Sequence, residues 1–398
     1  MTEIKGYLRK DGNKGIRNIL VVAYLVECAH HVAREICLPF RNDSVHLIGF
    51  GGCAPNEYAE TLMKAICTHP NVAGTLIVSL GCENFSKDEL YSVIENSGRA
   101  GHVVTIQEMG GTECSISEGQ SWLKATLPSL QGTSRVSFGI NELVVGTICG
   151  GSDATSGLTA NPAIGWVCDK LVSLGSTCIF EESGELIGCE NTLAKRASTE
   201  TLASDLVKAI GKADRFYKKL GHDSFSAGNT TGGLTTIAEK SLGAYCKSGH
   251  SMVSDIIVPG QRPPKGGLYF MDVIPEGEPL FGFPNINDNA EIIELVSCGA
   301  HMILFSTGRG SVVGSAISPV IKICANPVTF LKMQNDMDIN AGRILSGNVS
   351  IDDVGDEIYQ YLLRVVNGTP TVSERLKHQE FVLTYKPAFN SVRTTCQR

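Results

Sequence analysis

The chain has 398 residues, of which 42% are hydrophobic and 19% charged, a composition typical of a globular protein with room for roughly two or three domains. The net charge of −7 gives no basic footprint, so we do not expect nucleic acid as a partner. The apolar runs are short and the N-terminus lacks a signal core, so we expect no membrane span and a cytoplasmic location.

Cysteine and glycine are unusually abundant. Fourteen cysteines in a reducing compartment are expected to be free thiols or metal ligands rather than disulfides. Most of them should be small buried apolar residues. The 43 glycines indicate many tight strand-to-helix turns.

Residues 1–135 are predicted to form a first α/β domain. An apolar strand, a turn rich in glycine and cysteine, and a helix recur along this part of the chain, a pattern typical of a parallel sheet with helices on both faces. The predicted strands cover residues 19–25, 45–50, 74–80 and 103–106.

Three of these predicted strands run into a cysteine, namely Cys28, Cys53 and Cys82. Because the carboxyl ends of parallel strands share one edge of a sheet, these thiols are candidates for a common site. No CxxC pair is present, which disfavours structural zinc. Single ligands at strand ends, joined by Cys149, suit a catalytic iron or an iron–sulfur cluster, and the alternative is that they are packing thiols.

Residues 136–398 are predicted to form a second α/β domain that contains the catalytic loops. The predicted strands cover residues 143–148, 176–180, 254–258, 267–273, 302–305 and 319–323, and the predicted helices cover 163–174, 193–219, 235–242 and 352–366. We expect two parallel-sheet domains with the active site between them, at strand carboxyl ends.

The loop Cys149–Pro162 joins a buried strand to a helix and is rich in glycine. Open α/β sheets bind ligands at such loops, where glycine lets the backbone approach a ligand and the helix N-terminus offers N–H groups. Its thiol, carboxylate, hydroxyls and amide favour a functional role. The alternative is an ordinary strand-to-helix connection.

Several side chains are candidates for acid–base chemistry or for anion binding. Lys240 and Lys322 lie among small or apolar residues, where desolvation favours a lysine base, and His31 is a further candidate. Arg309, in a glycine-rich turn after a strand, suits a carboxylate or sulfonate, as does Arg17. Salt bridges or surface exposure are the alternatives for these cations.

Other common enzyme classes lack their signatures in this sequence. No GxGxxG follows the first predicted strand, no GxxxxGK[ST] is present, and no GxSxG is present. A nicotinamide enzyme, a P-loop nucleotide enzyme and a serine hydrolase of the α/β type are therefore not expected.

Long motifs between Gly6 and Gly342 resemble the altronate and galactarate dehydratases. They are GYLRKDGNKGIRN, HPNV, SLGCE, CGGSDATSGLTANPAIG, GNTTGGLTTIAEKSLG, STGRGSVVGSAISPVIKI and DMDINAG, in that order. The resemblance implies a lyase acting on a 2-hydroxy acid, with Fe²⁺ as the usual requirement.

Within that family the layout resembles the large subunits of the (2R)-sulfolactate sulfo-lyases. This resemblance implies a separate small subunit, an oligomeric assembly, and conversion of (2R)-sulfolactate to pyruvate and sulfite. The alternatives are a dehydratase of the altronate or galactarate type that releases water, and a noncatalytic acid-binding or regulatory subunit.

The resulting site hypothesis combines the motifs with this chemistry. Iron, alone or in a cluster, would be held by Cys28, Cys82 and Cys149. Ser152, Asp153 and Asn161 would line the substrate, and Arg309 or Arg17 would bind its anionic group. Cys53 is left out of the ligand set because it lies a few residues later than the corresponding family turn.

Overall fold

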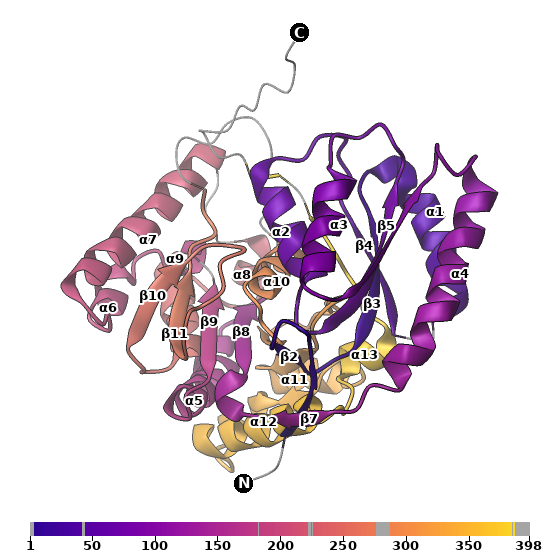
Figure 1. The fold of residues 1–398 in the computed structure, drawn as a ribbon. Coiled ribbons are helices and arrows are strands. Elements are labelled where there is room, and N and C mark those ends of the chain that lie inside the picture. Colours follow the sequence, from indigo (N-terminus) through magenta and orange to yellow (C-terminus); the bar gives the residue numbers. More distant parts are fainter. Residues whose placement is uncertain are drawn as a thin grey trace.

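The computed structural model describes residues 4–41, 44–181, 183–221, 224, 226–275, 287–383 and 385–386. Two parallel sheets with helices packed on their faces form most of this structure (Figure 1). The predicted α/β class is therefore confirmed.

The first sheet has four parallel strands, in the order β4 (Val45–Gly49), β3 (Ile19–Tyr24), β5 (Val72–Ser79) and β6 (Ala100–Thr105). Its helices are α1 (Glu27–Cys37), α2 (Glu57–Cys67), α3 (Lys87–Asn96) and α4 (Thr112–Gln131). Successive side chains of a strand point to opposite faces. Leu20 and Val22 therefore pack with α1 and α4, whereas Val21 and Ala23 pack with α2 and α3.

The second sheet has seven strands, and every neighbouring pair in it is parallel. The spatial order is β10 (Val253–Ile257), β11 (Gly267–Met271), β9 (Thr177–Glu181), β8 (Val144–Cys149), β12 (Met302–Thr307), β13 (Val320–Cys324) and β14 (Ile339–Asn340). From β8 the chain continues to β9 on one side, and it returns later to β12 on the other. The carboxyl ends of β8 and β12 therefore form the switch point where such sheets bind ligands.

Helices cover both faces of the second sheet. One face packs against α5 (Ala160–Ser173) and α12 (Ile351–Val366), and the other packs against α10 (Asp288–Ser297). Helix α10 also contacts α2 of the first sheet, so that one apolar core extends from one sheet to the other. The remaining helices are α6 (Glu190–Ala194), α7 (Glu200–Leu220), α8 (Ala227–Thr231), α9 (Ile237–Tyr245), α11 (Pro327–Lys332) and α13 (Val372–Leu376).

A small antiparallel sheet connects the start of the chain to the second domain, which the sequence did not predict. Its strands are β2 (Lys14–Gly15), β1 (Ile4–Leu8) and β7 (Val136–Phe138). Ile4 pairs with Phe138, and both side chains are buried in the core of the second sheet. Short edge strands of this kind carry little sequence signal, because their partner lies far away along the chain.

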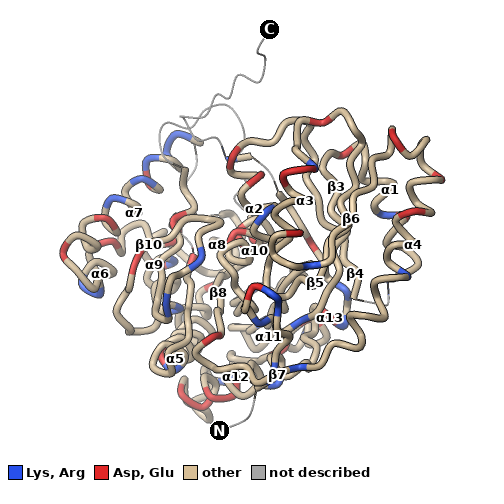
Figure 2. The backbone as a smooth tube through the Cα atoms, viewed as in Figure 1, with Lys and Arg blue, Asp and Glu red and all other residues tan. Residues whose placement is uncertain are grey.

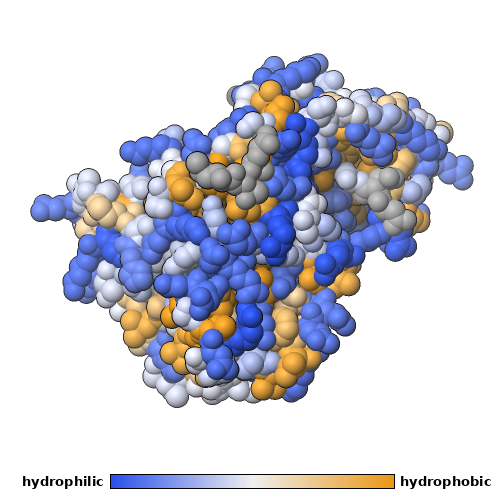
Figure 3. Space-filling view, turned by 90° about the horizontal axis from the view of Figure 1, so that it is seen from below, coloured by the Kyte–Doolittle hydropathy of each residue, from blue (hydrophilic) through white to orange (hydrophobic). Residues whose placement is uncertain are grey.

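Charged residues of both signs are spread over the described part of the chain. Segments of Lys or Arg are interspersed with segments of Asp or Glu, mostly on helices and loops (Figure 2). On the face drawn in Figure 3, hydrophobic residues form several separate groups between hydrophilic ones. None of the helices in the described part of the chain combines the length and the apolar composition needed to cross a bilayer.

Candidate active site

The loop after β8 brings Cys149 to the switch point of the seven-stranded sheet, where it pairs in register with Ser306 of β12. The next residue, Gly150, is packed so closely that a Cβ atom would lie 2.0 Å from Asp288 Oδ2 and 2.6 Å from Phe305 Cζ. Only glycine allows this approach. The first turn of α10 therefore lies directly against the loop.

Cys149 belongs to a chain of interacting polar side chains. Its buried Sγ lies 3.0 Å from Ser152 Oγ and donates to Glu185 Oε2 at 2.9 Å. The other carboxylate oxygen, Glu185 Oε1, lies 2.6 Å from Lys240 Nζ. The Lys240 side chain is 6% exposed and the Glu185 side chain 19% exposed, so the ion pair is shielded from most of the solvent.

The surroundings of Glu185 favour its charged form. Burial acts to raise its pKa, but Lys240, Lys247 and the thiol hydrogen bond act in the opposite direction and hold the pKa below the usual value. Glu185 is therefore a carboxylate at neutral pH and can accept a proton from a bound molecule.

The surroundings of Asp288, a second carboxyl group near Glu185, instead favour its protonated form. The pKa of Asp288 is raised to about 6, first by burial and then by the negative charge of Glu185, and the cations Lys247 and Lys240 only partly offset this. Two neighbouring carboxyl groups with pKa values pushed apart are typical of sites that need one base and one acid.

A pocket of about 300 Å³ opens beside this cluster, between the loop after β8 and α9. Its polar lining includes Ser152, Asp153, Asn161 and Lys240, and its apolar lining includes Leu158, Leu234 and Leu242. The structure thus brings together four of the side chains that the sequence singled out. Its volume and its mixed lining suit a small polar molecule.

Asp153 and Asn161 hold the loops around the pocket in place. Asp153 accepts hydrogen bonds from the Thr155 backbone N–H at 2.9 Å and from Asn326 Nδ2 at 2.9 Å, which joins the loops after β8 and β13. Asn161 donates to the Gly243 carbonyl at 2.9 Å and accepts from Ser306 Oγ at 2.5 Å. Both residues line the pocket with side chains whose orientation is fixed by the protein.

Arg309 lies above the same loop, on the turn after β12. Its backbone N–H donates to the Gly151 carbonyl at 3.0 Å, and its exposed guanidinium donates to the Gly228 carbonyl at 2.7 Å. Through its backbone and its side chain, Arg309 therefore joins the loop after β8 to the segment at Gly228, and its guanidinium carries further N–H groups that suit an anion.

The predicted iron ligands do not come together. Cys28 is exposed in the first turn of α1, and Cys53 and Cys82 are exposed on the loops after β4 and β5, whereas Cys149 is buried at the other sheet. Among the residues that the structure describes, no three His, Cys, Asp or Glu side chains are arranged to hold a metal ion. The described residues therefore do not fit an iron or cluster site as they stand, and the iron requirement stays a prediction.

Two of the predicted bases lie outside the pocket. Lys322 is fully buried on β13, and its Nζ lies 3.5 Å from His378 Nδ1. Burial lowers its pKa, and the nearby acids Asp336 and Asp338 oppose this shift. His31 is exposed on α1, with its Nδ1 3.3 Å from Arg34 Nη2. Neither residue is among those that line the pocket.

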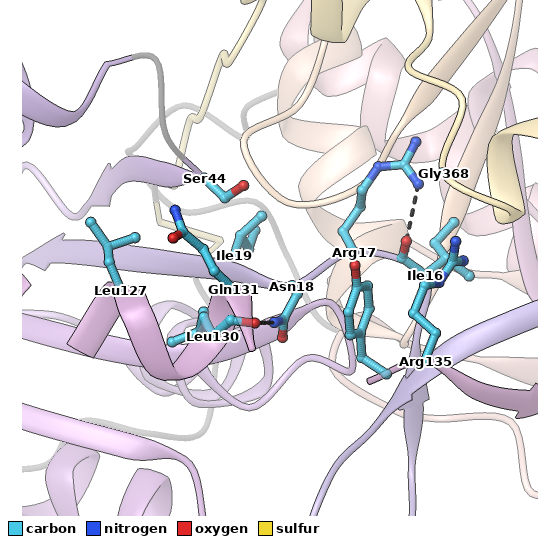
Figure 4. A pocket seen from close by; sticks show the side chains of 11 residues that line it. Ile16, Arg17, Asn18, Ile19, Ser44, Leu127, Leu130, Gln131, Arg135 and Gly368 are labelled. Carbon is cyan, nitrogen blue, oxygen red and sulfur yellow. Dashed lines mark hydrogen bonds between the residues drawn. The ribbon is translucent and has the colours of Figure 1, made fainter. Parts of the chain in front are cut away.

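Arg17 connects distant parts of the chain and does not reach the pocket. It lines a different cavity of about 270 Å³, together with Asn18 and Arg135 (Figure 4). Its guanidinium binds both carboxylate oxygens of Glu374, at 2.6 and 2.9 Å, and it also donates to the Val365 carbonyl. These contacts occupy the donors that the sequence analysis assigned to a substrate, so Arg17 holds the chain start against the end of α12.

Glu185 and Asp288 were not predicted as site residues from the sequence, and the reasons differ. Glu185 follows the buried strand β9 by a few residues, and a carboxylate after a strand end is the signal that singled out the loop at Cys149. Asp288 begins α10, and Asn287 caps that helix by accepting from the Ala290 N–H at 3.0 Å. The capping pattern predicts a helix start but not the approach to Gly150.

Two family models match consecutive parts of the chain. D-galactarate/altronate dehydratase, C-terminal, matches residues 140–388, and D-galactarate dehydratase/altronate hydrolase, second domain, matches residues 6–131. The chain belongs to this family. It is therefore an enzyme of the lyase class.

Curated relatives of this family member divide into two kinds. The chain is 30% identical to the (2R)-sulfolactate sulfo-lyase subunit beta of Chromohalobacter salexigens, over 95% of this chain and 96% of that one. It is 28% identical to the altronate dehydratase of Bacillus subtilis, over 95% of this chain and 77% of that one. It is 30% identical to the galactarate dehydratase (L-threo-forming) of Escherichia coli, over 96% and 76%.

Proposed function

We propose that this lyase catalyses a β-elimination on a small 2-hydroxy acid bound in the pocket beside α9. The observation that carries the proposal is Lys240, which lines a pocket with polar side chains in fixed positions and forms a shielded ion pair with Glu185 next to it. A carboxylate and an ammonium side by side provide a proton acceptor and a positive charge at one place.

In the proposed reaction Glu185 takes the proton from C2 of the substrate. The electrons of the C2–H bond form a C2=C3 double bond, the bond from C3 to the leaving group breaks, and the resulting enol becomes a 2-keto acid. Negative charge builds up on the substrate carboxylate as the proton leaves. The ammonium of Lys240, which lines the pocket, stabilises that charge.

In this mechanism Lys240 acts as an ammonium ion, whereas the sequence suggested it as a candidate base. A lysine base must be neutral, but the carboxylate of Glu185, 2.6 Å away, stabilises the ammonium form. Substrate binding adds a second carboxylate that competes for Lys240. Loss of part of this interaction raises the pKa of Glu185 and makes it a stronger base.

The leaving group has two candidates. The relative named (2R)-sulfolactate sulfo-lyase subunit beta supports sulfolactate as substrate, with sulfite and pyruvate as products. The relatives named altronate and galactarate dehydratase support a sugar acid, with water as a product. We further propose a separate small partner chain, since the first of these relatives is a subunit.

Product analysis tests the proposal. The purified chain is incubated with sulfolactate, with altronate and with galactarate, and sulfite, pyruvate and 2-keto-3-deoxy acids are measured. Formation of any of these keto acids supports the lyase. Tight binding of an acid without turnover, in a sample that contains iron and any copurifying partner, would instead favour a noncatalytic acid-binding subunit.

Replacing Arg309 with alanine is expected to raise KM about tenfold with little change in kcat, which corresponds to a loss of roughly 1.4 kcal/mol of binding. In this proposal the exposed guanidinium holds the substrate equally in the ground and transition states. Steady-state kinetics of Arg309→Ala and Arg309→Lys check this. A drop in kcat at constant KM would assign Arg309 to the chemical step.

A further inference from the structure

We propose that the pocket drawn in Figure 4 is a second binding site, which takes a small organic carboxylate and is separate from the candidate active site. Its volume is about 270 Å³, close to the 300 Å³ of the pocket beside α9. The two pockets share no lining residue. The inference therefore goes beyond the proposed elimination and does not depend on it.

The pocket lies where the first domain meets the small antiparallel sheet that joins the second domain. One side is formed by Ser44, just before β4, and by Gln131 at the end of α4. The other side is formed by Tyr7 of β1 and by Arg135, just before β7. Figure 4 shows Ser44 and Gln131 on one side, Arg135 on the other, and Asn18 between them. A ligand bound here therefore touches parts of the chain from both sides of the domain junction.

Arg135 brings a positive charge that is not paired with a carboxylate in the described part of the chain. Its guanidinium donates to three backbone carbonyls, those of Asn367, Lys5 and Val366. Its Nε is buried and has no hydrogen-bond partner among the described residues, and no acidic residue lines the pocket. A buried donor without a partner is costly. An oxygen atom of a bound anion would satisfy it and balance the charge.

The charges near Arg135 also favour an anion in the pocket. Arg17, the other arginine in the lining, is paired with Glu374, so this pair brings no net charge. Burial lowers the pKa of Arg135, Tyr7 opposes this shift, and the guanidinium of Arg17 adds to it. A carboxylate bound beside Arg135 would offset both the burial and the repulsion.

The rest of the lining indicates an organic acid rather than an inorganic ion. Within the described residues, the hydroxyls of Tyr7 and Ser44 and the amide of Gln131 form no hydrogen bonds, so they can bind polar atoms of a ligand. The apolar part of the lining suits a short carbon chain and consists of Ile16, Ile19, Leu127 and Leu130. A short carboxylate with a second polar group matches this combination.

Calorimetry on the full chain tests the ligand class. The probes are succinate, glycerate, the neutral analogue succinamide and inorganic phosphate. We expect saturable binding of succinate or glycerate with a Kd of about 1 mM or lower, and binding of succinamide and phosphate that is weaker by about tenfold or more. No saturable binding of either acid would overturn the proposal, as would phosphate or succinamide bound as tightly as the better acid.

Variants of the lining place the ligand in this pocket. Gln131→Glu adds a negative charge with little change in size and should weaken binding about tenfold or more, and Tyr7→Phe should weaken it about three- to tenfold. The control Gln334→Glu makes the same change at an exposed position outside the pocket and should leave the Kd within about twofold. Binding that survives Gln131→Glu would reject the second site, and its loss in Lys240→Met would then place the acid in the candidate active site.

Hydrogen exchange locates the ligand without any substitution. Because the pocket walls come from distant segments, the better-binding acid should slow backbone exchange in β1 and at the end of α4, and succinamide at the same concentration should not. Unchanged exchange in both elements, with or without protection of α9, would overturn the proposal.

Discussion

Glu185→Gln is expected to lower kcat about 1,000-fold or more, within the range seen when a general base is removed. Glutamine keeps the shape of the side chain and its contact with the Cys149 thiol but cannot take the C2 proton. The loss should be similar for every substrate that the enzyme accepts, because each elimination needs C2 deprotonation.

A control variant separates loss of the base from loss of stability, because Glu185 also neutralises Lys240. Glu185→Gln leaves the buried ammonium of Lys240 without its carboxylate, which destabilises the fold. The double variant Glu185→Gln/Lys240→Met removes both charges and should recover much of the stability while staying inactive. Activity in a folded Glu185→Gln variant at more than a tenth of the wild-type level would reject Glu185 as the base.

Lys386→Met is expected to destabilise the protein by about 3 kcal/mol or more, because it leaves a buried carboxylate without its cation. Lys386 Nζ forms an ion pair with Glu294 on α10 and donates to the Val273 carbonyl at 2.9 Å. Glu294 is fully buried and also accepts a hydrogen bond from Tyr58 OH of α2 at 2.6 Å. The pair thus joins the end of the chain to helices that pack between the two sheets.

Denaturant unfolding of Lys386→Met and of Lys386→Met/Glu294→Leu checks this prediction. Removing both charges should recover most of the lost stability, since an apolar pair of similar size avoids the unpaired charge. A single variant as stable as wild type would show that this ion pair is not formed in solution.

The regular elements of both sheets were largely predictable from the sequence. Apolar strands followed by glycine-rich turns and amphipathic helices repeat locally, so β3 to β6 and β8 to β13 were located to within a few residues. The thin sheet of β1, β2 and β7 and the short helices α8 and α13 were not predicted. They are too short for a periodic pattern and depend on partners that are distant along the chain.

The candidate site was likewise predictable from the sequence only in part. The loop at Cys149 was recognisable because one short stretch combines glycine with a thiol, a carboxylate and an amide, and four of the side chains singled out from the sequence line one pocket. The chemical role of each side chain could not be predicted from the sequence. Whether Lys240 is a base or an ion-paired ammonium depends on Glu185, which lies on another segment.

The α/β class, the family and the loop at Cys149 could be read from the residues alone. Which charged groups meet at that loop could not. In the folded chain Arg17 and Lys322 lie outside the pocket, Lys240 pairs with Glu185, and Asp288 lies against Gly150. Strands and helices follow from local periodicity, whereas pKa values and ion pairs follow from distances between segments that only packing sets.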